Sequence, residues 1–334
     1  MRVLLLDEGF VSGALTALGL QRVGCTVDVI AATGGAGACR TDAGTWRLGP
    51  RIGPELRDLV SRQRGYDVVY PTTEPLQRIF SGAVSDKRKT SAQMRGAGIP
   101  VPDEHSVGSE MELRDAINEL GTPLVVKGSV GRGGKTTFIV RSLREALRAA
   151  SRIRALGTDP FAQAHISGVT HLAGGLFENG RALRFYCGAK SVQVPARTGP
   201  SAELVSTDDP AFIKVALLAF EASRVTGLAS ADFIRDERGL YHFLELNPRP
   251  WGSISAARHA GVDLFTPLVA LWNRDSIRAD LSFQPGVRSV VFPLALFSMR
   301  CWASGSAIRS VPAPGNLRLA AHLAHRLMRV AYNW

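Results

Sequence analysis

Two acidic residues within apolar segments could bind a divalent cation together. Asp232 follows the mostly apolar residues 228–231, and Glu245 lies within the largely apolar segment 241–246. The polar residues 235–239 between these segments are typical of a turn. If the two segments are neighbouring antiparallel strands, the two carboxylates lie side by side, as ligands of one cation would.

Two polar residues follow Glu245 at alternate positions and extend this group. The side-chain oxygen of Asn247 is a third hard ligand, and such ligands suit Mg²⁺ that also bridges nucleotide phosphates. The planar guanidinium of Arg249 could bind a phosphate or a carboxylate through two parallel hydrogen bonds. Because an unpaired charge among apolar residues is unfavourable, we favour a metal site over an ordinary surface hairpin. The predicted metal ligands are Asp232, Glu245 and Asn247.

A glycine-rich segment provides a second group of candidates. Lys127 ends an apolar run, where a buried ammonium needs a partner such as a phosphate. The glycines after it would let backbone N–H groups approach phosphates. The segment is not a Walker A loop, because Ser129 stands where that motif has its first glycine and a strand, not a helix, is predicted next. The candidate phosphate contacts of this segment are Gly131, Gly133, Gly134 and Lys135.

The first part of the chain must position these groups through a sheet. Predicted strands at residues 3–6, 26–30 and 66–70 alternate with a predicted helix at 13–23. This alternation is typical of a parallel sheet, whose ligands bind beyond the carboxyl ends of the strands. Glu74 follows such an end and is a substrate candidate, although turn chemistry explains it equally well.

A β-hairpin is the clearest local prediction in the second half. An Asn-Gly pair at residues 179–180 separates two runs, 172–177 and 184–190. The hairpin carries Lys190, and the loop after it carries Arg197, which is suited to an anionic substrate. Each is equally consistent with a solvated residue.

Composition narrows the class of protein. With 45% hydrophobic residues and a net charge of +11, the chain resembles ordinary soluble globular proteins. The positive charge is spread along predicted helices, so nucleic acid is not an expected partner. The glycine-rich residues 34–46 are predicted to form a loop, without a dinucleotide fingerprint. The four cysteines lack metal-ligand spacing, and no apolar run reaches the roughly 18–20 residues of a membrane span, so we expect a cytoplasmic protein.

The end of the chain is strongly basic. Residues 281–334 contain six arginines and no acidic residue. The pattern of residues 317–334 predicts an amphipathic helix, which could lie on an anionic membrane surface. We favour packing of this helix on its own domain over membrane contact.

The motifs above resemble those of the ATP-grasp superfamily. Its signature D/E-F … h-E-h-N-x-R, where h is apolar, is similar to Asp232-Phe233 followed by residues 244–249. The resemblance extends from the N-terminus to about residue 275, and it is closest to the carbamoyl-phosphate-synthase-like and carboxylate–amine ligase branches.

This resemblance implies an α/β fold with an α+β grasp. An N-terminal parallel, Rossmann-like domain precedes two ATP-grasp subdomains with antiparallel sheets. The implied divisions are a pre-grasp domain (1–85), a linker helix and the segment leading into the grasp domain (86–104), a lid subdomain (105–165), a subdomain with the metal site (166–275) and a basic C-terminal extension (276–334).

The resemblance also implies ATP with Mg²⁺, or Mn²⁺ in its place. Lys87, at the start of a helix, and Lys127 would contact the phosphates. Gln163 and Ile166 match a hinge that binds adenine, whereas Ala164 and His165 depart from it. The carboxylate that commonly holds the ribose is replaced by Thr170 or His171, which leaves ribose recognition open.

The implied reaction joins a carboxylate to an amine. ATP converts the carboxylate into an acyl phosphate with release of ADP, and the amine then displaces phosphate to give an amide. Arg249 and Lys127 would stabilise the developing charge. The substrate candidates are Glu74, Arg197, Ser253 and Arg258.

Three alternatives remain open. The chain could phosphorylate bicarbonate as carboxylases do, or it could be a nucleotide-binding module without chemistry. It could also act at a membrane on a lipid-linked acceptor through its basic end. Small-molecule carboxylates and amines are the expected partners, and the resemblance is compatible with a homodimer.

Overall fold

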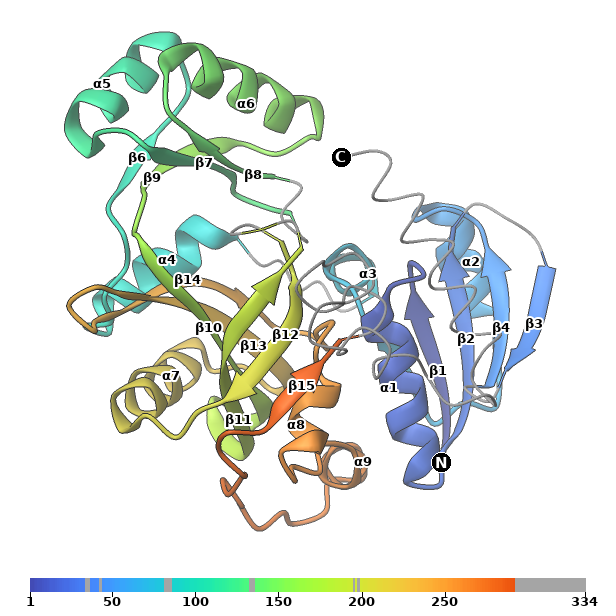
Figure 1. Cartoon of the computed structure of the whole chain (residues 1–334). Helices are drawn as coiled ribbons and strands as arrows, with labels where there is room; N and C mark the ends of the chain where they lie inside the picture. The colour runs from blue at the N-terminus through green and yellow to red at the C-terminus, as the bar shows by residue number, and fades with distance from the viewer. Residues whose placement is uncertain are drawn as a thin grey trace.

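The computed structural model describes residues 1–33, 37–41, 44–80, 86–131, 136–194, 196 and 199–291. Within these ranges the strands form three sheets, of five, six and four strands. Figure 1 shows the N-terminal sheet on one side of the molecule, with the four-stranded sheet standing above the six-stranded one. We call the four-stranded sheet the lid sheet and the six-stranded sheet the central sheet.

The N-terminal sheet is mostly parallel, as the alternating pattern predicts. β1 (Arg2–Asp7) lies between β2 (Thr26–Ala32) and β5 (Val68–Pro71), and β4 (Gly44–Gly49) extends the sheet beside β2. Successive residues of β1 enter different cores, so both of its faces are covered by helices. These helices are α1 (Val11–Arg22), α2 (Pro54–Ser61) and α3 (Glu74–Phe80).

One prediction in this region is wrong. Within residues 34–46, the described residues include β3 (Gly37–Thr41) and the start of β4, which pair antiparallel at the edge of the sheet. Strand pairing uses backbone groups, so a glycine-rich segment can join an existing edge without an alternating side-chain pattern. The buried ring of Trp46 anchors β4 in the core.

The lid sheet is antiparallel. Its strands are β6 (Glu104–Ser106), β7 (Leu124–Gly128), β8 (Thr137–Val140) and β9 (Pro160–Ala164), in the order β6-β9-β7-β8. Helices α5 (Glu110–Leu120) and α6 (Leu143–Ala155) share one apolar core with this sheet. β7 and β8 pair antiparallel on either side of the glycine-rich segment, as predicted.

The central sheet is antiparallel throughout. The hairpin predicted at residues 179–180 joins β10 (Gly168–Glu178) to β11 (Arg181–Gln193), and both turn residues have positive φ, at 49° and 83°. The remaining strands are β12 (Ser201–Ser206), β13 (Gly227–Asp236), β14 (Tyr241–Asn247) and β15 (Arg288–Val290), in the sheet order β14-β13-β10-β11-β12-β15.

Helices cover both faces of the central sheet. One face packs against α4 (Lys87–Gly96) and α7 (Pro210–Ser223). The other face shares a core with α1, α8 (Ser255–His259) and α9 (Phe265–Asn273), which joins it to the N-terminal sheet. Asp86 caps α4, because its carboxylate accepts the backbone N–H groups of Arg88 and Lys89.

The final described strand comes from the segment that the sequence leaves without a motif. β15 pairs antiparallel with β12 and completes the edge of the central sheet. The predicted amphipathic helix at 317–334 lies outside the described residues. Among the helices that the structure describes, none is long and apolar enough to cross a membrane.

Candidate active site

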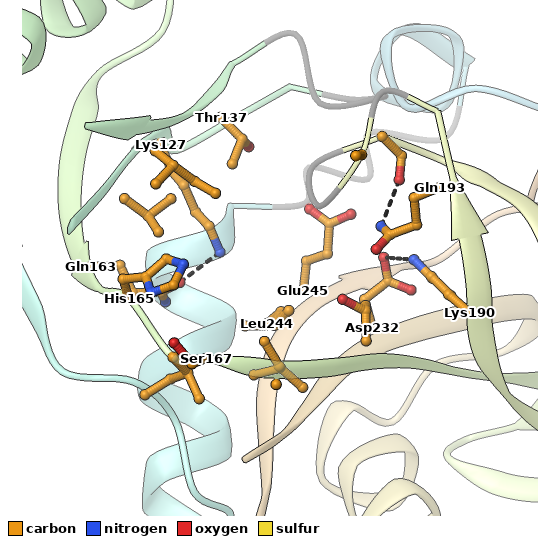
Figure 2. Close-up of a pocket in the computed structure, with 18 of the residues that line it drawn as sticks. Lys127, Thr137, Gln163, His165, Ser167, Lys190, Gln193, Asp232, Leu244 and Glu245 are labelled. Atoms are coloured by element: carbon orange, nitrogen blue, oxygen red, sulfur yellow. Dashed lines mark hydrogen bonds and ion pairs between the residues drawn. The ribbon is translucent and has the colours of Figure 1, made fainter. Parts of the chain in front are cut away.

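A cavity of about 610 Å³ lies between the lid sheet and the central sheet. Lys127 and Gln163 enter it from the lid sheet, and Lys190 and Asp232 enter it from the central sheet, as Figure 2 shows. Glu245 lies between these two groups. Apolar side chains from both sheets and from the segment between β9 and β10 complete the lining and are Val125, Ile139, Ile166, Val192, Ile234 and Leu244.

The two predicted metal carboxylates lie on paired strands. Asp232 of β13 is directly opposite Glu245 of β14, as expected from the sequence, and both line the cavity. Carboxylate oxygens beside an amide are hard donors, so this set fits Mg²⁺ or Mn²⁺. In the described part of the chain, no group of three or more His, Cys, Asp or Glu side chains is placed to hold a metal.

A β-bulge in β14 turns Glu245 toward the cavity. The register runs from Asp232 opposite Glu245 to Phe233 opposite Phe243, so Leu244 is an extra residue. Phe243 packs in the core beneath α4 and α7. Strict alternation would send Glu245 to that same core, away from Asp232. Because of the bulge, the consecutive residues Leu244 and Glu245 both line the cavity.

Asn247 and Arg249 extend the polar group away from the cavity lining. The amide nitrogen of Asn247 donates to Glu245 Oε1 at 3.2 Å, and Arg249 Nη2 donates to Asn247 Oδ1 at 2.9 Å. Arg249 Nε also donates to Glu74 Oε1 at 3.2 Å, and Gln77 Nε2 donates to the carbonyl of Pro248 at 2.7 Å. Helix α3 of the N-terminal region therefore contacts the residues that follow β14.

Three lysines surround the carboxylate pair. Lys87 Nζ is 3.8 Å from Glu245 Oε2 and donates to the carbonyl of Gly131 at 2.9 Å. Lys190 Nζ is 2.6 Å from Asp232 Oδ2. Lys127 Nζ donates to Gln163 Oε1 at 2.6 Å. All three side chains are buried, so their charges are screened less than charges at the surface.

Burial and neighbouring charges shift the ionisation of these groups. Burial, with repulsion from Lys87, lowers the pKa of Lys127 to about 8, although Glu245 and Glu104 oppose the shift. Burial and repulsion from Glu245 raise the pKa of Asp232 despite the charge of Lys190. Burial would also raise the pKa of Glu245, but Lys87 and Lys127 outweigh it and lower that pKa.

The predicted hinge reaches the cavity with a partner that the sequence did not reveal. Gln163 and Ile166 both line the cavity. Gln163 Nε2 donates to Glu104 Oε1 at 3.0 Å, while its oxygen accepts from Lys127. Glu104 lies on the three-residue strand β6, opposite Gln163. A strand this short carries no periodic signal, so sequence reasoning missed Glu104.

The structure also separates the two alternatives for the ribose position. His171 is buried, with its Nδ1 2.9 Å from the carbonyl of Val169, and its ring packs edge-on against Phe212 and Tyr241. Thr170 lines the cavity instead. Of the two residues, Thr170 is therefore the one that can face a ligand there.

Three substrate candidates among the described residues do not line the cavity. Ser253 is buried in the segment before α8, and Arg258 is exposed at the end of α8. Partial burial and the nearby charge of Arg22 lower the pKa of Arg258. Glu74 meets Arg249 rather than the cavity lining. The predicted residues Gly133, Gly134, Lys135 and Arg197 lie outside the described residues.

Sequence comparison identifies relatives that include carboxylases and ligases. A biotin carboxylase of Arabidopsis thaliana is 22% identical over 203 residues, which cover 56% of this chain and 37% of the relative. A D-alanine–D-alanine ligase of Dechloromonas aromatica is 29% identical over 183 residues, covering 52% of this chain and 60% of the relative. The chain thus spans less than two thirds of these curated relatives.

Structural comparison identifies solved structures with a similar fold. The crystal structure of the biotin carboxylase domain dimer of Hydrogenobacter thermophilus 2-oxoglutarate carboxylase, in complex with MgADP, ADP and bicarbonate, superposes with a TM-score of 0.67. The alignment covers 86% of this chain and 73% of that one at 17% identity, a level that supports the fold alone.

A family comparison covers the part of the chain that holds the cavity. The ATP-grasp domain matches residues 84–253, which include α4, the lid sheet and the strands β13 and β14 that carry Asp232 and Glu245. With its mostly parallel N-terminal sheet, antiparallel lid sheet and antiparallel central sheet, the chain belongs to the ATP-grasp family.

Proposed function

We propose that this protein is an ATP-dependent ligase that activates a carboxylate as an acyl phosphate and transfers the acyl group to an amine. The observation that carries the proposal is the cavity lined by an in-register carboxylate pair and by the buried lysines Lys127 and Lys190, with the buried Lys87 3.8 Å from Glu245. Two acids beside three cations suit a bound cation together with a polyphosphate better than they suit an uncharged ligand.

The lining supports a nucleotide in one orientation. The apolar side chains of Ile139, Ile166 and Leu244 suit the faces of a purine base. Thr170 can offer a hydroxyl to the ribose. Lys127 and Lys87 would then bind the phosphates, with Gly131 beside Lys87. This assignment makes Gln163 and Glu104 positioning residues, because Gln163 accepts a hydrogen bond from the ammonium of Lys127 and Glu104 accepts one from the amide of Gln163.

Asp232 and Glu245 would hold Mg²⁺ or Mn²⁺, with Asn247 supporting Glu245. When bound, the metal supplies charge neutralisation and a fixed orientation for the phosphates. The chain itself supplies the rest. The lysines balance the negative charge, and burial between two sheets limits the water that would hydrolyse an acyl phosphate.

Arg249 is the candidate to stabilise charge on the acyl group. Its guanidinium is held by Asn247 on one side and by Glu74 on the other, so its orientation is set before substrate binds. Glu74 is then a positioning residue rather than a direct substrate contact. Burial raises the pKa of Glu74, and Arg249 and Lys87 oppose that shift.

Bicarbonate is the second candidate for the activated group. A biotin carboxylase is among the relatives, and a structural neighbour contains bicarbonate. The D-alanine–D-alanine ligase among the relatives favours an amino-acid carboxylate instead. Phosphoryl transfer to either acceptor would use the same lysines and carboxylates.

The test is release of ADP and phosphate from MgATP across a matrix of carboxylates and amines, with bicarbonate as a separate acceptor. We expect ADP only with a particular acceptor, and we expect Lys127→Ala and Glu245→Gln to abolish it. Lys214→Ala, at an exposed position on α7, is the matched control and should retain turnover. Formation of AMP and pyrophosphate would overturn the mechanism, and tight MgATP binding without turnover would favour a non-catalytic module.

A further inference from the structure

Lys190 and Asp232 form a buried ion pair across the central sheet. The ammonium is 2.6 Å from Oδ2, and the two side chains are 5% and 20% exposed. In register, Asp232 lies opposite Leu172 of β10, and Leu172 lies opposite Gly188 of β11. Lys190 is the next residue after Gly188 on the same face of β11, so its long side chain can reach over β10 to Asp232.

This pair differs from the contacts of the other two lysines. Lys87 is 3.8 Å from Glu245 and is also hydrogen-bonded to a backbone carbonyl. Lys127 is hydrogen-bonded to an uncharged amide. Lys190 alone of the three makes a hydrogen-bonded contact with one of the two cavity carboxylates. A cation approaching Asp232 therefore meets a carboxylate oxygen that already accepts from an ammonium.

We propose that Lys190 is an internal counter-ion that prevents free metal ions from binding Asp232 until nucleotide phosphates bind the ammonium in its place. The inference rests on the proposed MgATP site and adds an order of events to it. A divalent cation and the ammonium repel each other at short range, so both cannot bind Asp232 favourably. Phosphates carry more charge than one carboxylate, and they can draw Lys190 away while they bring the metal.

The alternative is an ion pair that only stabilises the fold. In that case Lys190 would have no particular effect on metal binding, and its removal would change stability alone. The two views are separated by a measurement of metal binding in the absence of nucleotide, which needs neither turnover nor a known acceptor.

The experiment titrates MnCl₂ into the full chain without nucleotide and follows free Mn²⁺ by electron paramagnetic resonance. We expect weak binding by the wild type, and binding at least ~100-fold tighter by Lys190→Met, because a buried repulsive charge is gone. Lys190→Met combined with Asp232→Asn should lose that gain. Lys214→Met, which removes an exposed lysine, should behave as the wild type.

Circular dichroism establishes that each variant is folded, and Lys190→Gln replaces Lys190→Met if the methionine variant does not fold. No gain of Mn²⁺ binding in a folded Lys190 variant would overturn the inference. So would a wild type that binds Mn²⁺ as tightly without nucleotide as with a non-hydrolysable ATP analogue. Calorimetry of MgATP with the wild type runs in parallel, and absence of binding there would instead overturn the proposed function.

Discussion

Lys127 in the lid sheet and Lys190 in the central sheet line the same cavity with different partners. Lys127 donates to the uncharged amide of Gln163, and that amide in turn donates to the carboxylate of Glu104. Lys190 contacts Asp232 directly. A buried ammonium without a counter-ion in contact loses part of its preference for the charged form, and the pKa of Lys127 falls to about 8. The charge of Lys127 is therefore available to a ligand, whereas that of Lys190 is already engaged.

The largest expected effect is the loss of nucleotide affinity when Lys127 is removed. Lys127→Ala should weaken MgATP binding by about 100-fold or more, because a charge-assisted contact to phosphate in a buried site is lost. Isothermal titration calorimetry measures this, with Lys214→Ala as the control. A change below a few-fold would mean that Lys127 does not contact the phosphates.

Breaking the ion pair between Lys190 and Asp232 should have its largest effect on the stability of the fold. Asp232→Asn leaves the ammonium of Lys190 buried without its counter-charge and should lower the free energy of unfolding by about 3 kcal/mol. Combining Asp232→Asn with Lys190→Met should recover most of that loss, because both charges are then removed. Urea denaturation of the single and double variants measures the difference. Equal stability of the wild type and Asp232→Asn would contradict the ion pair.

Removal of Lys127 should stabilise the fold, in contrast to the Asp232→Asn change. Lys127→Met keeps a similar volume and removes a buried ammonium whose charged form is disfavoured, so it should raise the free energy of unfolding by about 2 kcal/mol at pH 7. The same denaturation experiment tests this. A destabilised Lys127→Met protein would show that the amide of Gln163 and the nearby carboxylates compensate the charge fully.

The comparison also predicts a pH dependence of nucleotide binding. In the free protein Lys127 is charged below pH 8 and loses its proton as the pH rises through about 8. Bound phosphates favour the charged form and raise this pKa, so MgATP affinity should be constant below pH 8. Above it, affinity should fall by up to about tenfold per pH unit. Lys127→Arg, which stays charged, should flatten the profile between pH 7 and 9.

The smallest expected effect comes from replacing Gln163, the amide partner of Lys127, with an acid. Gln163→Glu would give Lys127 a counter-ion in contact and should raise its pKa by about one unit, since an opposite charge nearby favours the ammonium. The fall in MgATP affinity should then begin near pH 9 rather than pH 8. A profile that does not move would show that another group controls the pH dependence.

The local features of this protein could be predicted from its residues. Apolar runs separated by an Asn-Gly turn identify the hairpin of β10 and β11, and alternating strands and helices identify the parallel N-terminal sheet. The buried position of Lys127 and the pairing of the two strands that carry Asp232 and Glu245 follow from polar residues within apolar segments and from the turn between those strands. Each of these depends on neighbours close in the chain, where period and turn chemistry act directly.

The details that complete the site depend on contacts between distant parts of the chain. The bulge at Leu244 reverses the face that alternation assigns to Glu245, and it appears only when β14 is paired with β13. Glu104 contacts Gln163 and Lys190 contacts Asp232 because sheet order and register bring them together. Glu74 contacts Arg249 because α3 packs against the residues that follow β14. A residue pattern encodes which side chains are polar and how often they recur along a segment. Which of them face one another is decided by tertiary pairing, because strand register and the packing of one sheet against another are not local properties.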